Sequence, residues 1–169
     1  MKKKSAGLLV YRQNGANVEV LLVHPGGPFW AKRNLGAWSI PKGEYSDDEN
    51  AMATAKREFE EELGHPSPAG DFVDLGTIVQ TNKKQVRAWA VEGELDTNNI
   101  QSNSFEMEWP PKSGRQQKFP EVDRAEWVPL QQAAAKMHTG QGAFVERLAK
   151  HLKIAYRPQA DPPSQAALL

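Results

Sequence analysis

The stretch GEYSDDENAMATAKREFEEELG, residues 43–64, is the most informative part of this sequence. Glu61 and Glu62 follow Glu58 by three and four positions, so a helix would gather the three side chains on one side. Carboxylates that lie this close repel one another unless a cation lies among them. The spacing therefore predicts a site for divalent metal and phosphate chemistry.

Signals at both ends of this stretch support a helix. Ser46 and Glu49 have the spacing of a capping box, which predicts that the helix begins there. Gly64 is the kind of residue that ends a helix. Residues at helical spacing predict the face that packs into the core: Met52, Ala55, Phe59 and Leu63. One helix is thus expected to serve both the core and the metal site.

Composition limits the class of protein. The chain has 169 residues with 39% hydrophobic content, so we expect one domain over residues 1–155 and a flexible tail over 156–169. Twenty-one basic residues balance twenty-one acidic ones, so no net charge favours nucleic acid or a membrane. Cysteine is absent, which excludes disulfides and thiolate metal sites. We therefore expect a soluble, cytoplasmic protein.

The rest of the chain predicts a mixture of strands and helices. An Asn-Gly pair at residues 14–15 predicts a hairpin between the first two strands. Strands are predicted at 5–12, 18–24, 72–80, 85–95 and 124–130, and helices at 131–138 and 142–152. The polar segment 96–120 is predicted to be a long functional loop such as a lid.

Eight residues carry a resemblance to a known family. The chain resembles Nudix hydrolases because its sequence matches their signature, the Nudix box, at Gly43, Glu49, Arg57, Glu58, Phe59, Glu61, Glu62 and Gly64. His65 departs from the aliphatic residue that is usual there. The resemblance implies an α+β fold, a mixed β-sheet sandwiched between α-helices, over about residues 5 to 152. The stretch WSIPKG, residues 38–43, is more weakly similar to the branch that cleaves diadenosine polyphosphates.

The same resemblance implies a set of site residues. Glu58, Glu61 and Glu62 would ligate Mg²⁺, or Mn²⁺ as a substitute, together with the backbone carbonyl of Lys42. Arg57 belongs to the same catalytic set. Arg57 would pair with Glu49 and so orient the ligands, and Gly43 would support the ligands with them.

The general base has several candidates. Nudix enzymes take it either from the box or from a glutamate in a later loop, and Glu61 is our first choice. Three glutamates in or beside the 96–120 segment are kept as reserves: Glu106, Glu108 and Glu121.

Substrate contacts are expected from loops around the box. Lys42 is a candidate for contact with a substrate phosphate. The alternative is that it is an exposed loop lysine without a role in the site. Three tryptophans in or beside loops are candidates for stacking on a nucleobase: Trp30, Trp38 and Trp109. Trp89 and Trp127 are predicted in the core. The loop histidines His24 and His65 are expected to be solvated or to pack rather than to act in catalysis.

The sequence therefore predicts a Mg²⁺-dependent pyrophosphohydrolase of a nucleoside polyphosphate, either a dinucleoside polyphosphate or a nucleoside triphosphate. Alternative substrates are a nucleotide-sugar, an oxidised nucleotide or a capped RNA end, and otherwise no nucleic acid is expected to bind. A non-catalytic regulator that senses nucleotides is the alternative of another class. Either a monomer or a homodimer fits the sequence.

Overall fold

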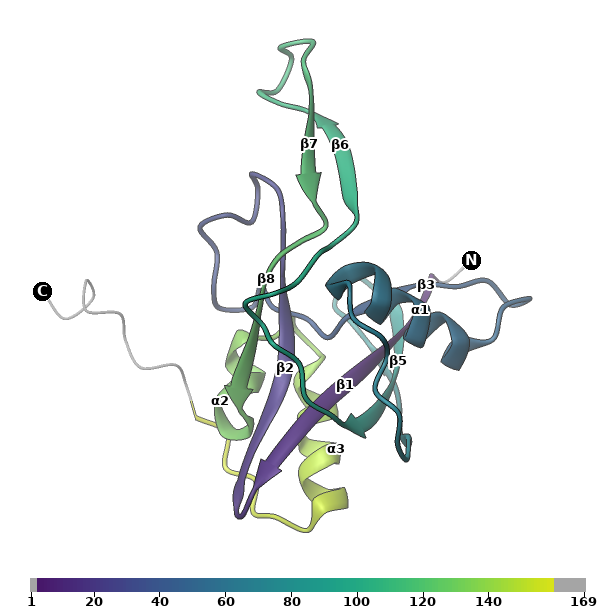
Figure 1. The fold of residues 1–169 in the computed structure, drawn as a ribbon, viewed down its shortest axis with the longest axis vertical. Coiled ribbons are helices and arrows are strands. Elements are labelled where there is room, and N and C mark those ends of the chain that lie inside the picture. The colour runs from purple at the N-terminus through teal and green to yellow at the C-terminus, as the bar shows by residue number, and fades with distance from the viewer. Residues whose placement is uncertain (1–2, 160–169) are drawn as a thin grey trace, which may run out of the picture.

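The computed structural model of the chain describes residues 3–159, and a mixed β-sheet lies at its centre (Figure 1). In this part of the chain the main sheet has six strands in the order β4-β5-β1-β2-β8, with β3 paired to β1 beside that path. β1 runs parallel to β5 and antiparallel to β2 and β3. The strands are β1 (Lys4–Asn14), β2 (Asn17–Pro25), β3 (Lys42–Glu44), β4 (Val73–Val79), β5 (Gln85–Glu92) and β8 (Val122–Pro129).

Helices cover both faces of this sheet. Side chains along β1 alternate between two cores, because successive residues of a strand point to opposite faces. Leu8 and Val10 share one core with Phe59 of the first helix, whereas Leu9 shares the other with Leu148 of the last. The helices are α1 (Ala51–Leu63), α2 (Leu130–Lys136) and α3 (Gly142–Leu152). The predicted α+β class, with a mixed sheet between helices, is confirmed.

Helix α1 begins later than its capping box predicts. Asn50 is the N-cap, and its Oδ1 accepts a hydrogen bond of 2.9 Å from the backbone N–H of Ala53. Ser46 and Glu49 do bond each other, but they close a turn that precedes the helix. The prediction of the starting residue is therefore wrong by one turn. Gly64 ends the helix as predicted, with φ of 71° and its N–H donating to Glu60.

The segment 96–120 is not the plain loop that its composition predicts. It contains a separate hairpin of β6 (Ser104–Glu108) and β7 (Gln116–Pro120), which projects from the body of the molecule (Figure 1). Phe105 and Phe119 pair across the two strands with ring centroids 6.0 Å apart. This contact gives the hairpin an apolar side, which the largely polar composition of the segment does not predict.

Among residues 3–159, none of the three helices has both the length and the apolar character that a membrane crossing requires. The predicted tail at 156–169 lies outside the described residues from position 160 onward. The domain boundary at 155 stays a prediction.

The N-cap can be tested by mutation. Asn50→Ala should lower the free energy of unfolding by about 1 kcal/mol, because it removes the acceptor for an N–H at the helix start. Ser46→Ala is the matched control and should cost less, because Glu49 still accepts from the Ser46 backbone. Urea unfolding with an unchanged m-value measures both effects. An equal loss in the two variants would contradict the assignment of Asn50.

Candidate metal and nucleotide site

The site is organised by a close contact between strand β3 and helix α1. A Cβ added to Gly43 would lie 2.0 Å from Cδ of Glu58, so only glycine leaves room for this carboxylate. β3 is itself held by pairing with β1, where Ala6 lies opposite Gly43. The core contact of Phe59 fixes the other side of the helix. The Glu58 carboxylate therefore lies directly on the β3 backbone.

Glu62 lies deepest in the site. Its Oε2 atom is buried and has no hydrogen-bond partner among the described residues. Burial raises the pKa of Glu62 to about 8, although the nearby charge of Lys42 opposes this shift. Burial also lowers the pKa of Lys42, and the charge of Lys84 acts in the same direction. A buried carboxylate oxygen without a partner is a strong candidate for a cation ligand.

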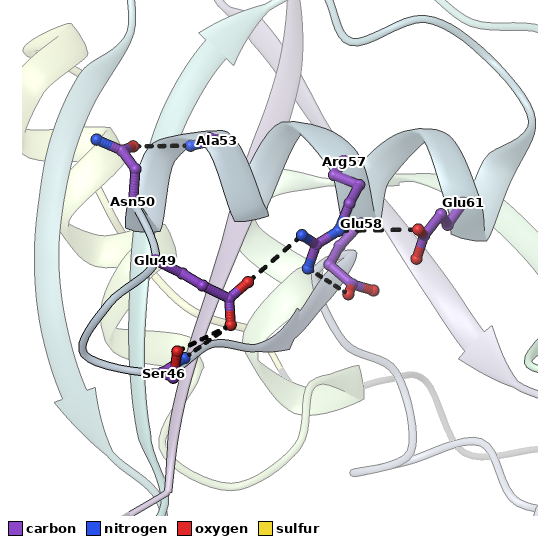
Figure 2. Close-up of polar contacts among 7 residues, drawn as sticks. All are labelled: Ser46, Glu49, Asn50, Ala53, Arg57, Glu58 and Glu61. Atoms are coloured by element: carbon purple, nitrogen blue, oxygen red, sulfur yellow. Dashed lines mark hydrogen bonds and ion pairs between the residues drawn. The ribbon is translucent and has the colours of Figure 1, made fainter.

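Arg57 links the other carboxylates (Figure 2). Its guanidinium lies 3.5 Å from Glu49, 3.5 Å from Glu58 and 3.7 Å from Glu61. Hydrogen bonds from the backbone and hydroxyl of Ser46 lower the pKa of Glu49, so this partner of Arg57 stays ionised. These ion pairs are largely exposed and contribute little to stability, so their effect is to orient the carboxylates.

The donor set suits a hard divalent cation. Glu58, Glu61 and Glu62 offer only oxygen, which Mg²⁺ prefers, and one of these oxygens is buried without a partner. Burial and the charge of Glu61 raise the pKa of Glu58, although the guanidinium of Arg57 opposes this shift. Within residues 3–159, no three acidic or histidine side chains already converge on one point. Glu58 and Glu61 instead turn toward Arg57 (Figure 2).

A cavity of about 270 Å³ opens beside these carboxylates. Its lining includes the charged residues Glu62, Lys42 and Glu121 and the aromatic residue Trp30. A larger hollow of about 640 Å³ lies at the β1–β2 turn, but its lining includes none of the predicted site residues. The smaller cavity is therefore the better candidate for a substrate site, since a candidate metal ligand, Glu62, and the aromatic residue Trp30 both line it.

The structure separates the three reserve bases. Glu121, between β7 and β8, lines the cavity, and its charge helps to raise the pKa of both Glu58 and Glu62. Glu106 and Glu108 lie in the projecting hairpin and are not among the described residues that line the cavity. Glu108 instead accepts a hydrogen bond of 2.6 Å from the backbone of Lys112.

The three candidate tryptophans have different surroundings. Trp30 lines the cavity, as a stacking residue must. Trp38 is 1% exposed and donates to Asn34, so the ring expected to stack on a nucleobase is part of the core instead. Trp109 contacts the ring of Phe29 edge-on at 5.5 Å, outside the cavity. Trp89 is buried as predicted, whereas Trp127 is half-buried against the same core.

The structure also shows the surroundings of the two histidines that were expected to be solvated or to pack. His24 is fully buried in β2 rather than solvated in a loop, because the predicted strand extends through it to Pro25. His65 lies after α1, and its ring contacts the carbonyl of Asn99. Neither residue is among the described residues that line the cavity.

Sequence reasoning missed the far wall of the cavity. Gln141 is fully buried, accepts from the N–H of Ile40 and donates to Ser39 and Gln80. It comes from the turn before α3, about 100 positions from Ser39 and Ile40, which it bonds. Lys84 also lines the cavity, from the β4–β5 turn. A buried glutamine has no local sequence signal, because its hydrogen-bond partners are assembled only by folding.

Comparison with known families and structures gives a consistent result. A sequence model of the NUDIX domain family matches residues 1–148. The comparison with curated protein sequences found no significant match.

Solved structures with a similar fold span nearly the whole chain. An Ap4A hydrolase from C. elegans, as a binary complex, has a TM-score of 0.63 at 20% identity, covering 89% of this chain and 98% of its own. The NUDIX domain of Shewanella oneidensis NrtR, complexed with ADP ribose, has a TM-score of 0.60 at 15% identity, with 90% and 89% covered. A MutT protein from Methanosarcina mazei Go1 has a TM-score of 0.57 at 20% identity, with 90% and 96% covered.

The β3–α1 contact can be tested at Gly43. Gly43→Ala should weaken Mn²⁺ binding about tenfold or more, because the added Cβ displaces the Glu58 carboxylate. Gly70→Ala is the matched control, since its Cβ would meet only an ordinary contact of 3.5 Å with Val91. Calorimetric titration of the two variants with Mn²⁺ gives the affinities. Unchanged affinity in Gly43→Ala would show that Glu58 is not a ligand.

The raised pKa of Glu62 predicts how pH affects the metal-free protein. The folded state holds this proton up to about pH 8, and the unfolded state releases it near 4.5, so stability from this group falls as pH rises between those values. Glu62→Gln removes the effect. The variant should therefore gain more than about 1 kcal/mol over the original chain between about pH 5 and pH 8.

Urea unfolding in the presence of a chelator measures this difference. Titrating groups far from Glu62 are shared by the two proteins and cancel in the comparison, whereas the charges that interact with Glu62, those of Lys42, Glu58 and Glu121, contribute to the difference. A difference in unfolding free energy that stays constant with pH would contradict the buried, protonated state of Glu62.

Proposed function

Because this chain belongs to the NUDIX domain family of hydrolases, we propose that it cleaves a diphosphate linkage in a nucleoside polyphosphate with the help of Mg²⁺. One observation carries the proposal: Glu62, with its buried unpartnered oxygen, lines the same cavity as the ring of Trp30. That arrangement can hold a charged diphosphate at one end and a nucleobase at the other. The amino-acid composition of the chain, which includes no cysteine, fits a cytoplasmic location.

The carboxylates of α1 take the metal-binding role. Glu58, Glu61 and Glu62 hold Mg²⁺, with Mn²⁺ as a substitute, and the backbone carbonyl of Lys42 completes the set. When bound, the ion neutralises phosphate charge and lowers the pKa of a bound water. Arg57 holds Glu58 and Glu61 in place through its anchor on Glu49. Glu62 gives up its proton when the ion binds, because a ligand must be ionised.

Glu121 is the favoured general base. It lines the cavity beside Glu62 and comes from a different element than the metal ligands. Glu61, the first choice from sequence, lies 3.7 Å from the guanidinium of Arg57, which suits a ligand better than a proton acceptor. Glu121 would therefore accept the proton of the attacking water, and no covalent intermediate with the enzyme forms.

Lysines at the charged end of the cavity bind the phosphates. Lys42 and Lys84 both line it, so their ammonium groups can neutralise the part of the substrate that leaves. The cavity volume of about 270 Å³ lies near the lower end of the range for small-molecule sites, roughly 300–1,000 Å³. It therefore takes one nucleoside, and the rest of a dinucleoside polyphosphate extends over the exposed carboxylates. The fold shared with an Ap4A hydrolase supports this substrate class.

The metal ligands can be tested directly. Glu61→Gln and Glu62→Gln should each slow metal-dependent release of phosphate-containing products by about 100-fold or more, because each removes a charged ligand. Glu60→Gln is the matched control, since Glu60 is exposed and its side chain accepts a hydrogen bond from the backbone N–H of Ser67, away from the other glutamates. The assay uses nucleoside triphosphates, dinucleoside polyphosphates, nucleotide-sugars and capped RNA with Mg²⁺, with products resolved by chromatography.

The same assay decides between the competing functions. Unchanged turnover in both glutamine variants would overturn the assignment of the metal ligands. Tight nucleotide binding without turnover of any compound would instead favour a nucleotide-sensing regulator.

The general base has a separate signature. Glu121→Gln should lower kcat by about 100-fold while leaving the affinity for Mn²⁺ within about twofold, because the base acts on water and not on the ion. Glu106→Gln, in the hairpin, is the control and should change neither quantity. A loss of Mn²⁺ affinity in Glu121→Gln would make this residue a ligand instead, and unchanged kcat would return the role to Glu61.

A further inference from the structure

The ring of His24 is fully buried and both of its nitrogens have partners. Nδ1 lies 2.8 Å from a carboxylate oxygen of Asp123 in β8, and Nε2 lies 2.6 Å from the backbone carbonyl of Arg33. The pairing of β2 with β8 shifts register next to His24, between this residue and Pro25. The histidine thus lies where the regular sheet ends and the segment 26–36 begins.

Hydrogen-bond chemistry restricts the protonation state of this ring. A backbone carbonyl can only accept, and an ionised carboxylate can only accept. A neutral imidazole has a single N–H, so it can donate to one of these two partners but not to both. Both contacts are hydrogen bonds only if His24 is an imidazolium.

Among the charged groups around the ring, Asp123 is the one that favours this state. Asp123 supplies the negative charge at Nδ1, and Arg124 lies 3.5 Å from the same carboxylate oxygen. On the other side, the ring meets Trp38 edge-on at 5.1 Å, and the cations of Arg124 and Lys136 lie over that indole. The remaining neighbour, Arg33, turns its guanidinium to Trp30. The imidazolium therefore depends on Asp123.

The two partners of His24 lie close in the chain to Trp30 and Glu121, which line the cavity. Arg33 is part of the segment 26–36, and its guanidinium lies 5.4 Å from the ring of Trp30. Asp123 follows Glu121 by two positions, and the carbonyl of Glu121 accepts from the N–H of Gly26 at 2.9 Å. A Cβ on Gly26 would lie 1.9 Å from the carbonyl oxygen of Pro120. The segment 26–36 is therefore in close contact with the chain just before β8.

We propose that His24 is a positioning residue: its doubly protonated ring holds the segment 26–36 against β8, so that Trp30 and Glu121 face the same nucleotide. The segment and the protonation are independent of the chemistry of the site, whereas the effect on nucleotide binding rests on the proposed function. Loss of one ring proton leaves either the Arg33 carbonyl or the Asp123 carboxylate without its donor. The segment then opens more often.

Two substitutions separate charge from contact. His24→Asn shortens the side chain and cannot span both acceptors, so the segment should loosen. Asp123→Asn keeps the contact but changes its chemistry, because the amide can donate to Nδ1 while a neutral ring donates from Nε2 to Arg33. The segment should therefore stay closed in Asp123→Asn, with the ring in one neutral tautomer. His151→Asn, at an exposed position in α3, is the matched control.

The protonation is measured by NMR of ¹⁵N-labelled histidine between about pH 5 and pH 8, the range in which histidine ordinarily changes charge. His24→Asn identifies the signals. In the original chain both nitrogens of His24 should carry protons at the acid end of the range. A single neutral tautomer there would overturn the proposal, whether Asp123 then holds the missing proton or not.

Opening of the segment is measured by hydrogen exchange of the peptide covering residues 26–36, corrected for intrinsic rates. At the same pH, His24→Asn should exchange about tenfold faster or more, as expected for a lost buried hydrogen bond to a charged group. In the original chain, exchange should rise as the second ring proton is lost. In Asp123→Asn and His151→Asn it should match the closed state. Exchange that is indifferent to His24, or independent of its protonation, would overturn the proposal.

Binding of ADP with Mg²⁺ tests the effect on the site. His24→Asn should weaken the binding of ADP about fivefold or more. Asp123→Asn should keep an affinity for ADP within about twofold of that of the original chain. Equal affinity in His24→Asn, with a loosened segment, would overturn the positioning of Trp30. If the original chain itself binds no ADP, the proposed function fails, and the NMR and exchange results still decide the state of His24.

Discussion

The contact between the Gly43 backbone and the Glu58 carboxylate is the constraint from which the site follows. Strand β3 has only three residues, and it is kept in place by pairing with β1 on one side and by helix α1 on the other. A larger residue at position 43 would displace the end of the Glu58 side chain from this place on the sheet. Because Phe59 anchors the same turn of α1 in the core, the position of the carboxylates is set by packing rather than by their own interactions.

The two basic residues near these carboxylates differ in how far they are buried. Arg57 is half-exposed and contacts Glu49, Glu58 and Glu61, so it orients ligands at little cost in desolvation. Lys42 is largely surrounded by protein near Glu62, where burial disfavours both charges. The outer carboxylates thus lie beside a half-exposed guanidinium, whereas the inner carboxylate of Glu62 would gain its charge when a bound cation offsets the burial.

Much of the fold and the placement of the three glutamates on one helix were predictable, because the signals are local. The spacing of Glu58, Glu61 and Glu62 depends only on helical geometry, and Gly64 ends the helix through its own φ angle. The errors concern long-range contacts: Trp38 is buried by His24 and by the end of α2, and β6 finds its apolar side only in β7. The substrate walls share this property, since Gln141 and Glu121 approach the box only in the folded chain.

The parallel pairing of β1 with β5 has a consequence for the order in which the molecule can form. Lys4 lies opposite Gln85 in this pair, so the central strand waits for about 80 further residues before it has a partner on the edge that β5 occupies. At a ribosomal rate of about 5–20 residues per second, this wait lasts roughly 4–16 seconds. During that time one edge of the β1–β2 hairpin has no partner from β5. Its apolar residues are then the natural place for a chaperone to bind or for nascent chains to associate.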